Sequence, residues 1–367
     1  MKPTTLGDIC EFKYGRSLPE STRVQGRFRV FGSNGSVGTH VEPLTEAPAI
    51  IIGRKGSIGE VHYSSNPCWP IDTTYYVDRS GTRQDIRWLY FALKSLRLTD
   101  LNKATGVPGL NRNDAYERKL VVPSLEEQQR IAAILDYADG IRCKRDQMLV
   151  MADEFLKSAF LEMFGHPLDP APILQVSTLG QECDFFAGNS LPQGVEFTGQ
   201  DNGLFLLKVS DLNSPGNETV ITSARIWAPS EESVRGGVIA PEGAIVFPKR
   251  GGAIATNKKR ILSRRSVLDP NLMAVGPKPR SVITIEYLRS WFVLIDLTLI
   301  TSGSAVPQLN KRDLDPIPFV VPNPAQIGIF TELSVKTAKL IGRLRGEASD
   351  AFNLYEGLVQ RAFHGEL

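Results

Sequence analysis

Long hydrophobic runs, paired cysteines and an excess of one charge are all missing from this 367-residue sequence. No apolar stretch reaches the roughly 18 residues that a membrane span needs, and Met1-Lys-Pro-Thr does not begin a signal peptide. The four cysteines lie far apart without a CxxC pair, which argues against a zinc site or a disulfide framework. We therefore expect a cytoplasmic protein with no membrane partner.

Motifs for catalysis are also missing. The four histidines show no metal-ligand spacing, and HExxH, GxSxG, GxxxxGK[ST] and a helix-opening GxGxxG are absent. Asp269-Pro-Asn-Leu shares only its first two letters with an adenine-methylation motif. These absences predict a binding protein with no catalytic residue, metal or cofactor of its own. The formal net charge of +2 is too small to indicate nucleic acid unless basic residues cluster locally.

What the sequence does contain is an internal repeat. Thr, Leu, Gly, Cys, Phe, Gly, Ser, Leu and Pro recur at matching places in residues 5–19 and 178–192. The octapeptide that begins at Val107 is echoed by the one that begins at Val306, and a Val-Val-Pro step follows in each half. A match of this length within one chain indicates two copies of one structural unit.

A long helix is predicted after each Val-Val-Pro step. Ser124 precedes a stretch without proline that ends at Phe164, and Glu127 completes a capping box with it. Apolar residues recur there every three or four positions, at Ile131, Ile134, Leu135, Ala138, Ile141, Met148, Ala152, Phe155, Ala159 and Met163. The period is near 3.5, so we expect a coiled-coil seam along a rod of roughly 60 Å.

The second helix begins with Asn323 as N-cap and Pro324 at the first helical position. Its matching seam is Ile327, Phe330, Leu333, Ala338, Ile341, Leu344, Ala348, Phe352, Tyr355, Leu358 and Ala362. Mutual burial of the two seams requires the helices to run antiparallel.

We predict an α+β fold with two pseudo-repeated α/β globules joined by two antiparallel coiled-coil helices, in a circular, pseudo-two-fold organisation. The expected divisions are globule 1–123, helix 124–165, globule 166–322 and helix 323–367. Each globule should contain one curved, mostly antiparallel or mixed sheet and one short helix, at Asp85–Leu96 and Ile285–Ile295. The expected strands lie at Arg27–Phe31, Ala49–Ile52, Tyr75–Val77, Leu204–Val209, Ala244–Phe247 and Leu272–Val275.

Both halves place two adjacent basic residues beside glycines after a strand, at Arg54-Lys55 and Lys249-Arg250. Residues 249–265 contain seven basic side chains and no acidic one, which indicates a nucleic-acid contact. A solvated basic hairpin is the alternative for either loop alone, but the recurrence favours binding. The DNA-binding candidates are Arg16, Arg54, Lys55, Ser57, Asn111, Arg112, Lys249, Arg250, Asn257, Lys258, Lys259, Asn310, Lys311 and Arg312. Ser33–Ser36 fits a tight turn at least as well as base contacts, and Tyr14 and Tyr75 are expected in the core.

The sequence as a whole resembles the specificity (S) subunits of type I restriction-modification systems. The features that carry the resemblance are the Thr-Leu-Gly entries at Thr5 and Thr178, the Val-Pro-x-Leu-Asn turns at Val107 and Val306, and the VVPSLEEQQRIAAIL helix start at Val121. The second helix departs from this pattern, since it lacks the LEEQQRI start and contains three glycines that lower helicity, Gly328, Gly342 and Gly346.

The resemblance implies two target recognition domains that each read one half of a split, asymmetric sequence in double-stranded DNA. The helices would fix the spacer between the half-sites, and two modification (M) subunits would dock on them. Those subunits would bind S-adenosylmethionine and methylate adenine at N6, and restriction (R) subunits would add ATP- and Mg-dependent translocation and cleavage. Two alternatives remain, a scaffold that binds protein and, against the missing motifs, a DNA methyltransferase or nuclease in its own right.

Overall fold

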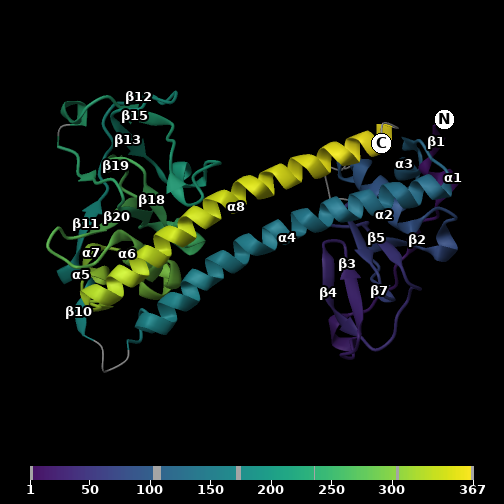
Figure 1. Cartoon of the computed structure of the whole chain (residues 1–367), viewed down its shortest axis with the longest axis horizontal. Coiled ribbons are helices and arrows are strands. Elements are labelled where there is room, and N and C mark those ends of the chain that lie inside the picture. The colour runs from purple at the N-terminus through teal and green to yellow at the C-terminus, as the bar shows by residue number, and fades with distance from the viewer. Residues whose placement is uncertain (1–2, 102–108, 171–174, 235, 303–305, 365–367) are drawn as a thin grey trace. The chain divides into compact units, whose positions relative to one another are not determined.

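The computed structural model describes residues 3–101, 109–170, 175–234, 236–302 and 306–364. They form two compact units (Figure 1). Unit 1 contains Met1–Met148 and Leu344–Leu367, and unit 2 contains Leu149–Arg343. In the described part of the chain, no helix has the length and apolar character to cross a membrane. The finer division at residues 123, 165 and 322 stays a prediction.

Two helices of about forty residues dominate the chain, α4 (Leu125–Phe164) and α8 (Pro324–His364). The remaining elements of unit 1 are β1 (Thr4–Thr5), α1 (Leu6–Ile9), β2 (Lys13–Tyr14), β3 (Phe28–Gly32), β4 (Gly35–His40), β5 (Ala49–Gly53), β6 (Val61–Ser64), β7 (Cys68–Pro70), β8 (Thr74–Asp78), α2 (Ile86–Ser95), α3 (Arg112–Tyr116), β9 (Lys119–Leu120) and the 3-10 helices η1 (Glu20–Thr22), η2 (Arg79–Gly81) and η3 (Leu98–Leu101).

Unit 1 contains two main sheets. One is antiparallel with the strand order β2-β8-β5-β6, and the other has the order β4-β3-β7, in which β3 and β7 run parallel. Strand β5 is buried on both faces: Ile50 and Ile52 pack into the core that α2 and the helices α4 and α8 cover, and Ala49 and Ile51 face Phe31 and Cys68. This two-sided burial explains why β5 is a continuous apolar run in the sequence.

Besides its parts of α4 and α8, unit 2 contains β10 (Val176–Thr178), α5 (Leu179–Glu182), β11 (Cys183–Ala187), β12 (Val195–Glu196), β13 (Leu204–Leu207), β14 (Val220–Ile221), β15 (Ile226–Ala228), β16 (Ile239–Ala240), β17 (Ile245–Pro248), β18 (Arg260–Leu262), β19 (Ser266–Leu268), β20 (Leu272–Pro277), α6 (Ile285–Leu294), α7 (Lys311–Leu314), β21 (Pro318–Val320) and the 3-10 helices η4 (Val209–Asn213), η5 (Glu231–Val234), η6 (Gly251–Thr256) and η7 (Leu297–Ile300).

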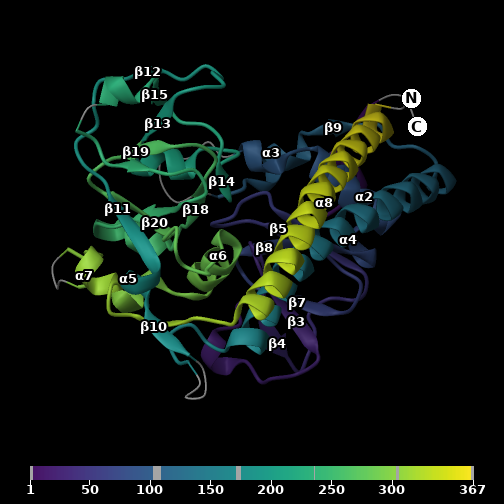
Figure 2. The same ribbon diagram turned by 60° about the vertical axis from the view of Figure 1, so that its left-hand side comes forward.

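Unit 2 has three layers, which are two β-sheets and the helix α6 (Figure 2). Its sheets have the orders β11-β20-β17-β18-β14 and β12-β15-β13-β19-β16. Val246 lies in the core between the two sheets, while its neighbours Ile245 and Phe247 face a second core with α6 and the long helices. The alternation along β17 therefore joins both cores through one strand.

The predicted repeat is confirmed by the strand topology. The order β2-β8-β5-β6 of unit 1 returns as β11-β20-β17-β18, and the parallel pair β3/β7 returns as β13/β19. The short pairs β1/β9 and β10/β21 also correspond. The expectation of one sheet per globule was wrong, because each unit has two main sheets and unit 2 adds β12, β14, β15 and β16.

Each unit packs opposite ends of α4 and α8 together, so the helix directions are antiparallel within a unit. In unit 1, Arg145 of α4 forms an ion pair with Glu347 of α8 at 2.8 Å. In unit 2, Phe160 of α4 packs edge-to-face on Phe330 of α8, with ring centroids 5.5 Å apart. The helix pairing predicted from the two apolar seams is present in both units.

The helix caps match the sequence prediction with one difference. The backbone N–H of Glu127 donates to Ser124 Oγ at 3.3 Å, but the Glu127 carboxylate binds Arg130 at 2.7 Å instead of returning to the cap. At α8 the backbone N–H of Gln326 donates to Asn323 Oδ1 at 2.9 Å, and Asn323 Nδ2 donates to Gln326 Oε1.

The predicted seam is only partly buried. The buried seam residues are Ile131, Leu135, Ala138, Ala152, Ile327, Phe330, Leu344, Tyr355 and Ala362. The partly buried ones are Ile134, Ile141, Ala159, Met163, Leu333, Ile341, Ala348 and Leu358, and the small Ala338 is exposed. Met148, Phe155 and Phe352 are exposed, so the expected continuous buried stripe is interrupted in the middle of the helices. The cores of the two units bury the helix ends, and no sheet covers these three positions in the described residues.

Candidate nucleic-acid interface

In unit 1 the basic loop after β5 is held against the segment before α3. The backbone N–H of Arg54 donates to Thr73 O at 2.9 Å, and Leu110 N–H donates to Arg54 O at 2.8 Å. Lys55 and Gly109 form an isolated antiparallel bridge. Two stretches that are far apart in the sequence, both chosen as DNA-binding candidates, are therefore neighbours. Val107 and Pro108 of the predicted turn lie outside the described residues.

This neighbourhood contains an open cavity of about 430 Å³, and we call it the unit 1 cleft. Its lining consists of Tyr14, Arg54, Lys55, Tyr75 and residues 109–113. The Arg54 guanidinium lies 5.2 Å from the centre of the Tyr14 ring and 5.9 Å from that of Tyr75. Arg112 approaches the same Tyr14 ring at 5.5 Å. Two guanidinium groups thus share one exposed aromatic ring, an arrangement suited to an anionic ligand with flat rings.

Tyr75 is the fixed wall of the cleft. Its hydroxyl donates to Leu110 O at 3.2 Å, and burial, together with the neighbouring Tyr14, raises the pKa of Tyr75 to about 12. The expectation that Tyr75 belongs to the core is confirmed. Tyr14 is instead 53% exposed, so its assignment to the core was wrong. Its place beside Gly15 and Arg16, at the end of a short strand, is the sequence signal that could have identified it.

Unit 2 repeats the backbone of this site with different side chains. Lys249 N–H donates to Asn271 O at 2.7 Å, Leu309 N–H donates to Lys249 O at 2.9 Å, and Arg250 forms the isolated bridge with Gln308. Lys249 therefore corresponds to Arg54, and Arg250 to Lys55.

The side chain of Lys249 turns inward. It is only 8% exposed, and its Nζ donates to Gly188 O at 3.5 Å. Burial lowers the pKa of Lys249, with a smaller contribution in the same direction from Arg250. The exposed cation of this loop is Arg250.

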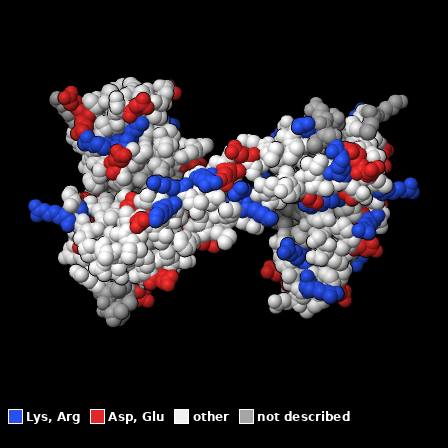
Figure 3. Space-filling model, in the orientation of Figure 1, with Lys and Arg blue, Asp and Glu red and all other residues white. Residues whose placement is uncertain are grey.

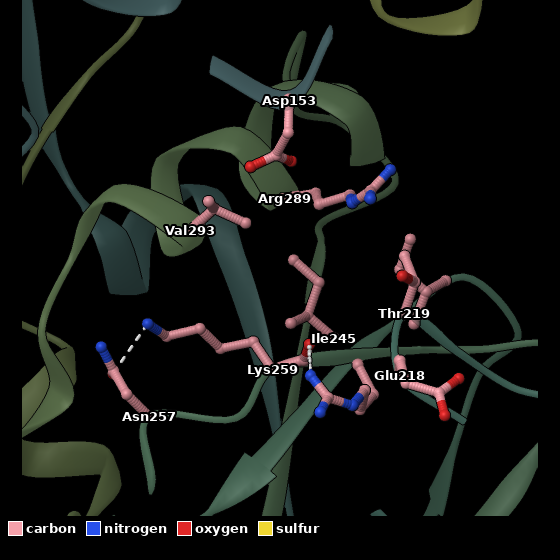
Figure 4. A pocket seen from close by; sticks show the side chains of 10 residues that line it. Asp153, Glu218, Thr219, Ile245, Asn257, Lys259, Arg289 and Val293 are labelled. Carbon is pink, nitrogen blue, oxygen red and sulfur yellow. Dashed lines mark hydrogen bonds between the residues drawn. The ribbon is translucent and has the colours of Figure 1, made fainter. Parts of the chain in front are cut away.

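Further along the same basic stretch, three predicted DNA-binding residues form hydrogen bonds within the unit, and Figure 4 shows two of them, Asn257 and Lys259. Lys259 Nζ donates to Ile295 O at 2.5 Å and to Asn257 Oδ1 at 2.8 Å, beside a cavity of about 230 Å³. Asn257 has a left-handed backbone with φ of 53°, and its Oδ1 also accepts from Leu297 N–H at 3.0 Å. Lys258 Nζ donates to Asn213 Oδ1. Burial lowers the pKa of Lys259 to about 8.

The remaining candidates divide between caps and exposed positions. Asn111 Oδ1 accepts from Asn113 N–H at 2.8 Å and caps α3, and Asn310 occupies the corresponding cap of α7. The exposed candidates are Arg16, Ser57, Lys311 and Arg312. Residues 33–34 form the turn between β3 and β4, which confirms the turn interpretation of Ser33–Ser36.

Charge on the molecular surface is mixed. On the face in Figure 3, basic and acidic side chains are interspersed over both units without a broad patch of one sign. The net charge of +2 agrees with this picture. A broad basic patch has no support on this face, so local groups such as those in the unit 1 cleft are the candidates for electrostatic recognition. Within the described ranges, no cluster of three or more His, Cys, Asp and Glu side chains is placed to hold a metal ion.

Comparison with known proteins finds a family match for the first 147 of the 367 residues. Residues 1–147 match the model for the type I restriction modification DNA specificity domain. The specificity subunit of the type I restriction enzyme EcoprrI from Escherichia coli is 29% identical over 147 residues. That match covers 38% of this chain and only 36% of the relative, so it spans about a third of that protein's length.

Two solved structures are similar over nearly the whole chain. The S subunit of a type I restriction-modification system from M. genitalium has a TM-score of 0.63 at 15% identity, covering 99% of this chain and 96% of that one. A chain from a structure of complex assembly and conformational transition in the type I R-M system has a TM-score of 0.53 at 16% identity, covering 100% and 98%. At these identities the likeness concerns the fold. Residues 1–147 therefore match the family of type I restriction modification DNA specificity domains, and over its whole length the chain has the fold of a type I S subunit.

Proposed function

We propose that this chain is the DNA sequence-specificity subunit of a type I restriction-modification complex. Each unit would read one half of a bipartite, asymmetric site. The observation that supports this best is the shared loop scaffold, which presents Arg54 and Lys55 in unit 1 but Lys249 and Arg250 in unit 2. One backbone with two sets of side chains is suited to two different half-sites, because backbone geometry sets the position of contacts and side chains set base preference.

The long helices would set the spacer between the half-sites and bind two M subunits. Support comes from large apolar side chains that the helices leave in solvent, with exposed fractions of 76% for Tyr137, 67% for Met151 and 62% for Ile329. Exposed apolar groups on a helix are typical of an interface with another protein. Gly328, Gly342 and Gly346 lower the helix propensity of α8, so the support for M-subunit binding is weaker at α8 than at α4.

Chemistry in the assembled complex would reside on partner subunits in the cytoplasm. The M subunits would bind S-adenosylmethionine and methylate adenine at N6, and R subunits would supply ATP- and Mg-dependent restriction. This chain would contribute no catalytic residue, and its part is to position the DNA.

The experiment is to co-express the chain with the M subunit encoded beside it and to map adenine methylation across the host genome. A split, asymmetric motif that appears only when this chain is present is the expected result. Cells with the M subunit alone serve as the control. A stable complex that leaves no motif in the genome would contradict the proposal and favour a protein-binding scaffold.

A further inference from the structure

Arg54 is held in place before any ligand arrives. Its backbone is fixed on both sides by hydrogen bonds to Thr73 and Leu110, and its guanidinium lies over the rings of Tyr14 and Tyr75. A side chain that is already ordered loses little conformational freedom on binding, and the N–H donors of its guanidinium already point in a fixed direction.

The charge of Arg54 is not used by the fold. Among the described residues it forms no ion pair, and its Nε is buried without a hydrogen-bond partner. Arg87 offers a comparison within the same unit, because it also stacks on Tyr63 and Tyr90 but pairs with Asp136 at 2.5 Å. Arg87 is a structural arginine, whereas Arg54 lines the open unit 1 cleft. The terminal nitrogens of Arg54 make no hydrogen bond among the described residues, so they are available to an external acceptor in the cleft.

The fixed plane of Arg54 favours a base over a phosphate. A phosphate accepts hydrogen bonds from many directions and suits the exposed, flexible ammonium of Lys55. A planar fork held at one angle suits two acceptors at a fixed spacing, and in the DNA major groove guanine presents such a pair in O6 and N7. Because Nε is covered, the two terminal nitrogens of the guanidinium would make the contact.

We propose that Arg54 is a specificity-determining residue that reads one guanine in the half-site bound by unit 1. This inference rests on the proposed function. Unit 2 has no equivalent contact, since the corresponding residue is Lys249, whose side chain is 8% exposed and directed at Gly188 O. The guanine preference from this position therefore belongs to one half-site alone.

The test uses the assembled complex with the M subunits and its own bipartite site. Each guanine of the site is replaced in turn by 7-deazaguanine, which lacks the N7 acceptor, and DNA affinity is measured for wild type and for R54Q. One guanine in one half-site should cost the wild type roughly 5- to 150-fold in affinity. At that guanine, R54Q should show no further loss on substitution. K249Q is the matched variant in unit 2. In K249Q, the affinity loss caused by 7-deaza substitution at this guanine should be the same as in the wild type.

The outcomes separate the two claims. If the wild-type complex selects a bipartite site but no guanine is sensitive to 7-deaza substitution, the Arg54 inference is wrong and the proposed function stands. Equal sensitivity of R54Q and wild type at every guanine would likewise assign Arg54 to phosphate contact or to folding. A wild-type complex that selects no site at all would overturn the proposed function itself. Should R54Q not fold, R54K carries the comparison, because it keeps the charge and loses the fork.

Discussion

Lys55 and Arg250 occupy corresponding places in the two loop scaffolds, and both side chains are exposed. We expect Lys55→Ala to weaken DNA binding by the assembled complex to a similar degree for all sequences, because an exposed ammonium contacts phosphate rather than bases. The plot of log affinity against log salt concentration should lose about 0.9 from its slope. Titrations of labelled DNA at several salt concentrations measure this.

Lys249→Ala is the control for that measurement. The sequence alone predicts that it too weakens DNA binding, but the structure turns its side chain into the fold, so we now expect an effect on stability with the salt slope unchanged. A reduced slope for Lys249→Ala, or an unaltered one for Lys55→Ala, would show that the exposure of these two residues in the free protein does not report their contacts.

Lys259 should make stability depend on pH in an alkaline window. Burial lowers its folded-state pKa from 10.5 to about 8, with Asp296 opposing the shift. Between pH 8 and pH 10.5 the unfolded chain therefore binds more protons at this residue than the folded one, and its contribution to stability rises with pH. We expect the free energy of unfolding of wild type, minus that of Lys259→Met, to increase across this window. Denaturant titrations at pH 7.5, 8.5 and 9.5 would detect it, and a constant difference would contradict the inward placement of Lys259.

Sequence reasoning located both loops but not the direction of their side chains. Glycines next to paired basic residues identify a loop at Arg54 and at Lys249 alike. Whether the cation faces solvent depends on what the rest of the unit provides, here Tyr14 and Tyr75 for Arg54 and the Gly188 carbonyl for Lys249. Those partners are distant in the sequence, so local composition contains no information about them.

At the scale of elements, α4 is anchored to unit 1 by a few fully buried residues. Leu135 has no exposed surface and packs in the same core as Trp88 and Leu89 of α2. We expect Leu135→Ala to lower the free energy of unfolding by about 2–5 kcal/mol, through lost burial and the cavity that remains. Chemical denaturation followed by circular dichroism measures it.

Tyr137, two positions along the same helix, is the control for this substitution. Its side chain is 76% exposed, so Tyr137→Ala should change stability by less than about 0.5 kcal/mol. Similar losses for both variants would mean that the helix is not packed as described.

The glycines of α8 give a prediction of the opposite sign. A Cβ added at Gly342 would meet no atom within 4 Å. Gly342→Ala should therefore stabilise the free chain by up to about 1 kcal/mol, because alanine gains helix propensity without a clash. Thermal unfolding should show a higher Tm, and a lower one would indicate that α8 bends at this glycine.

Elements were the most predictable level of this protein. The long helices were found because their apolar period persists over forty residues, and strands β5, β8, β17 and β20 because each is a bounded apolar run. The short strands β12, β14 and β16 have two residues each and only one or no buried apolar side chain, so no pattern marks them. The second sheet in each unit was missed because pairing between distant strands leaves no local trace.

For the whole molecule, the important feature is that unit 1 is assembled from two distant parts of the chain. Tyr355 and Ala362 of α8 belong to the same core as Ile50 of β5 and Leu135 of α4, and the Phe363 ring packs 6.1 Å from that of Trp88. Residues 1–148 alone should therefore have lower stability than they have in the full chain. A separate peptide of residues 344–367 should raise their Tm in a concentration-dependent manner.

The control peptide exchanges Tyr355 and Phe363 for serine, which removes the two aromatic contacts with Phe91 and Trp88. It should have no effect on Tm. Equal effects of both peptides, or of neither, would show that the C-terminal part of α8 is not needed to complete this core.

That division also sets an order of events during synthesis. Roughly 200 residues separate Met148 from Tyr355, and at 5–20 residues per second the ribosome needs roughly 10–40 s to make them. Unit 2 has all of its residues once Arg343 is made, while unit 1 still lacks part of its core. The later unit in the sequence can thus fold first, and during this interval the nascent chain exposes the apolar side chains of unit 1 that Tyr355 and Ala362 will cover, a surface for chaperones to bind.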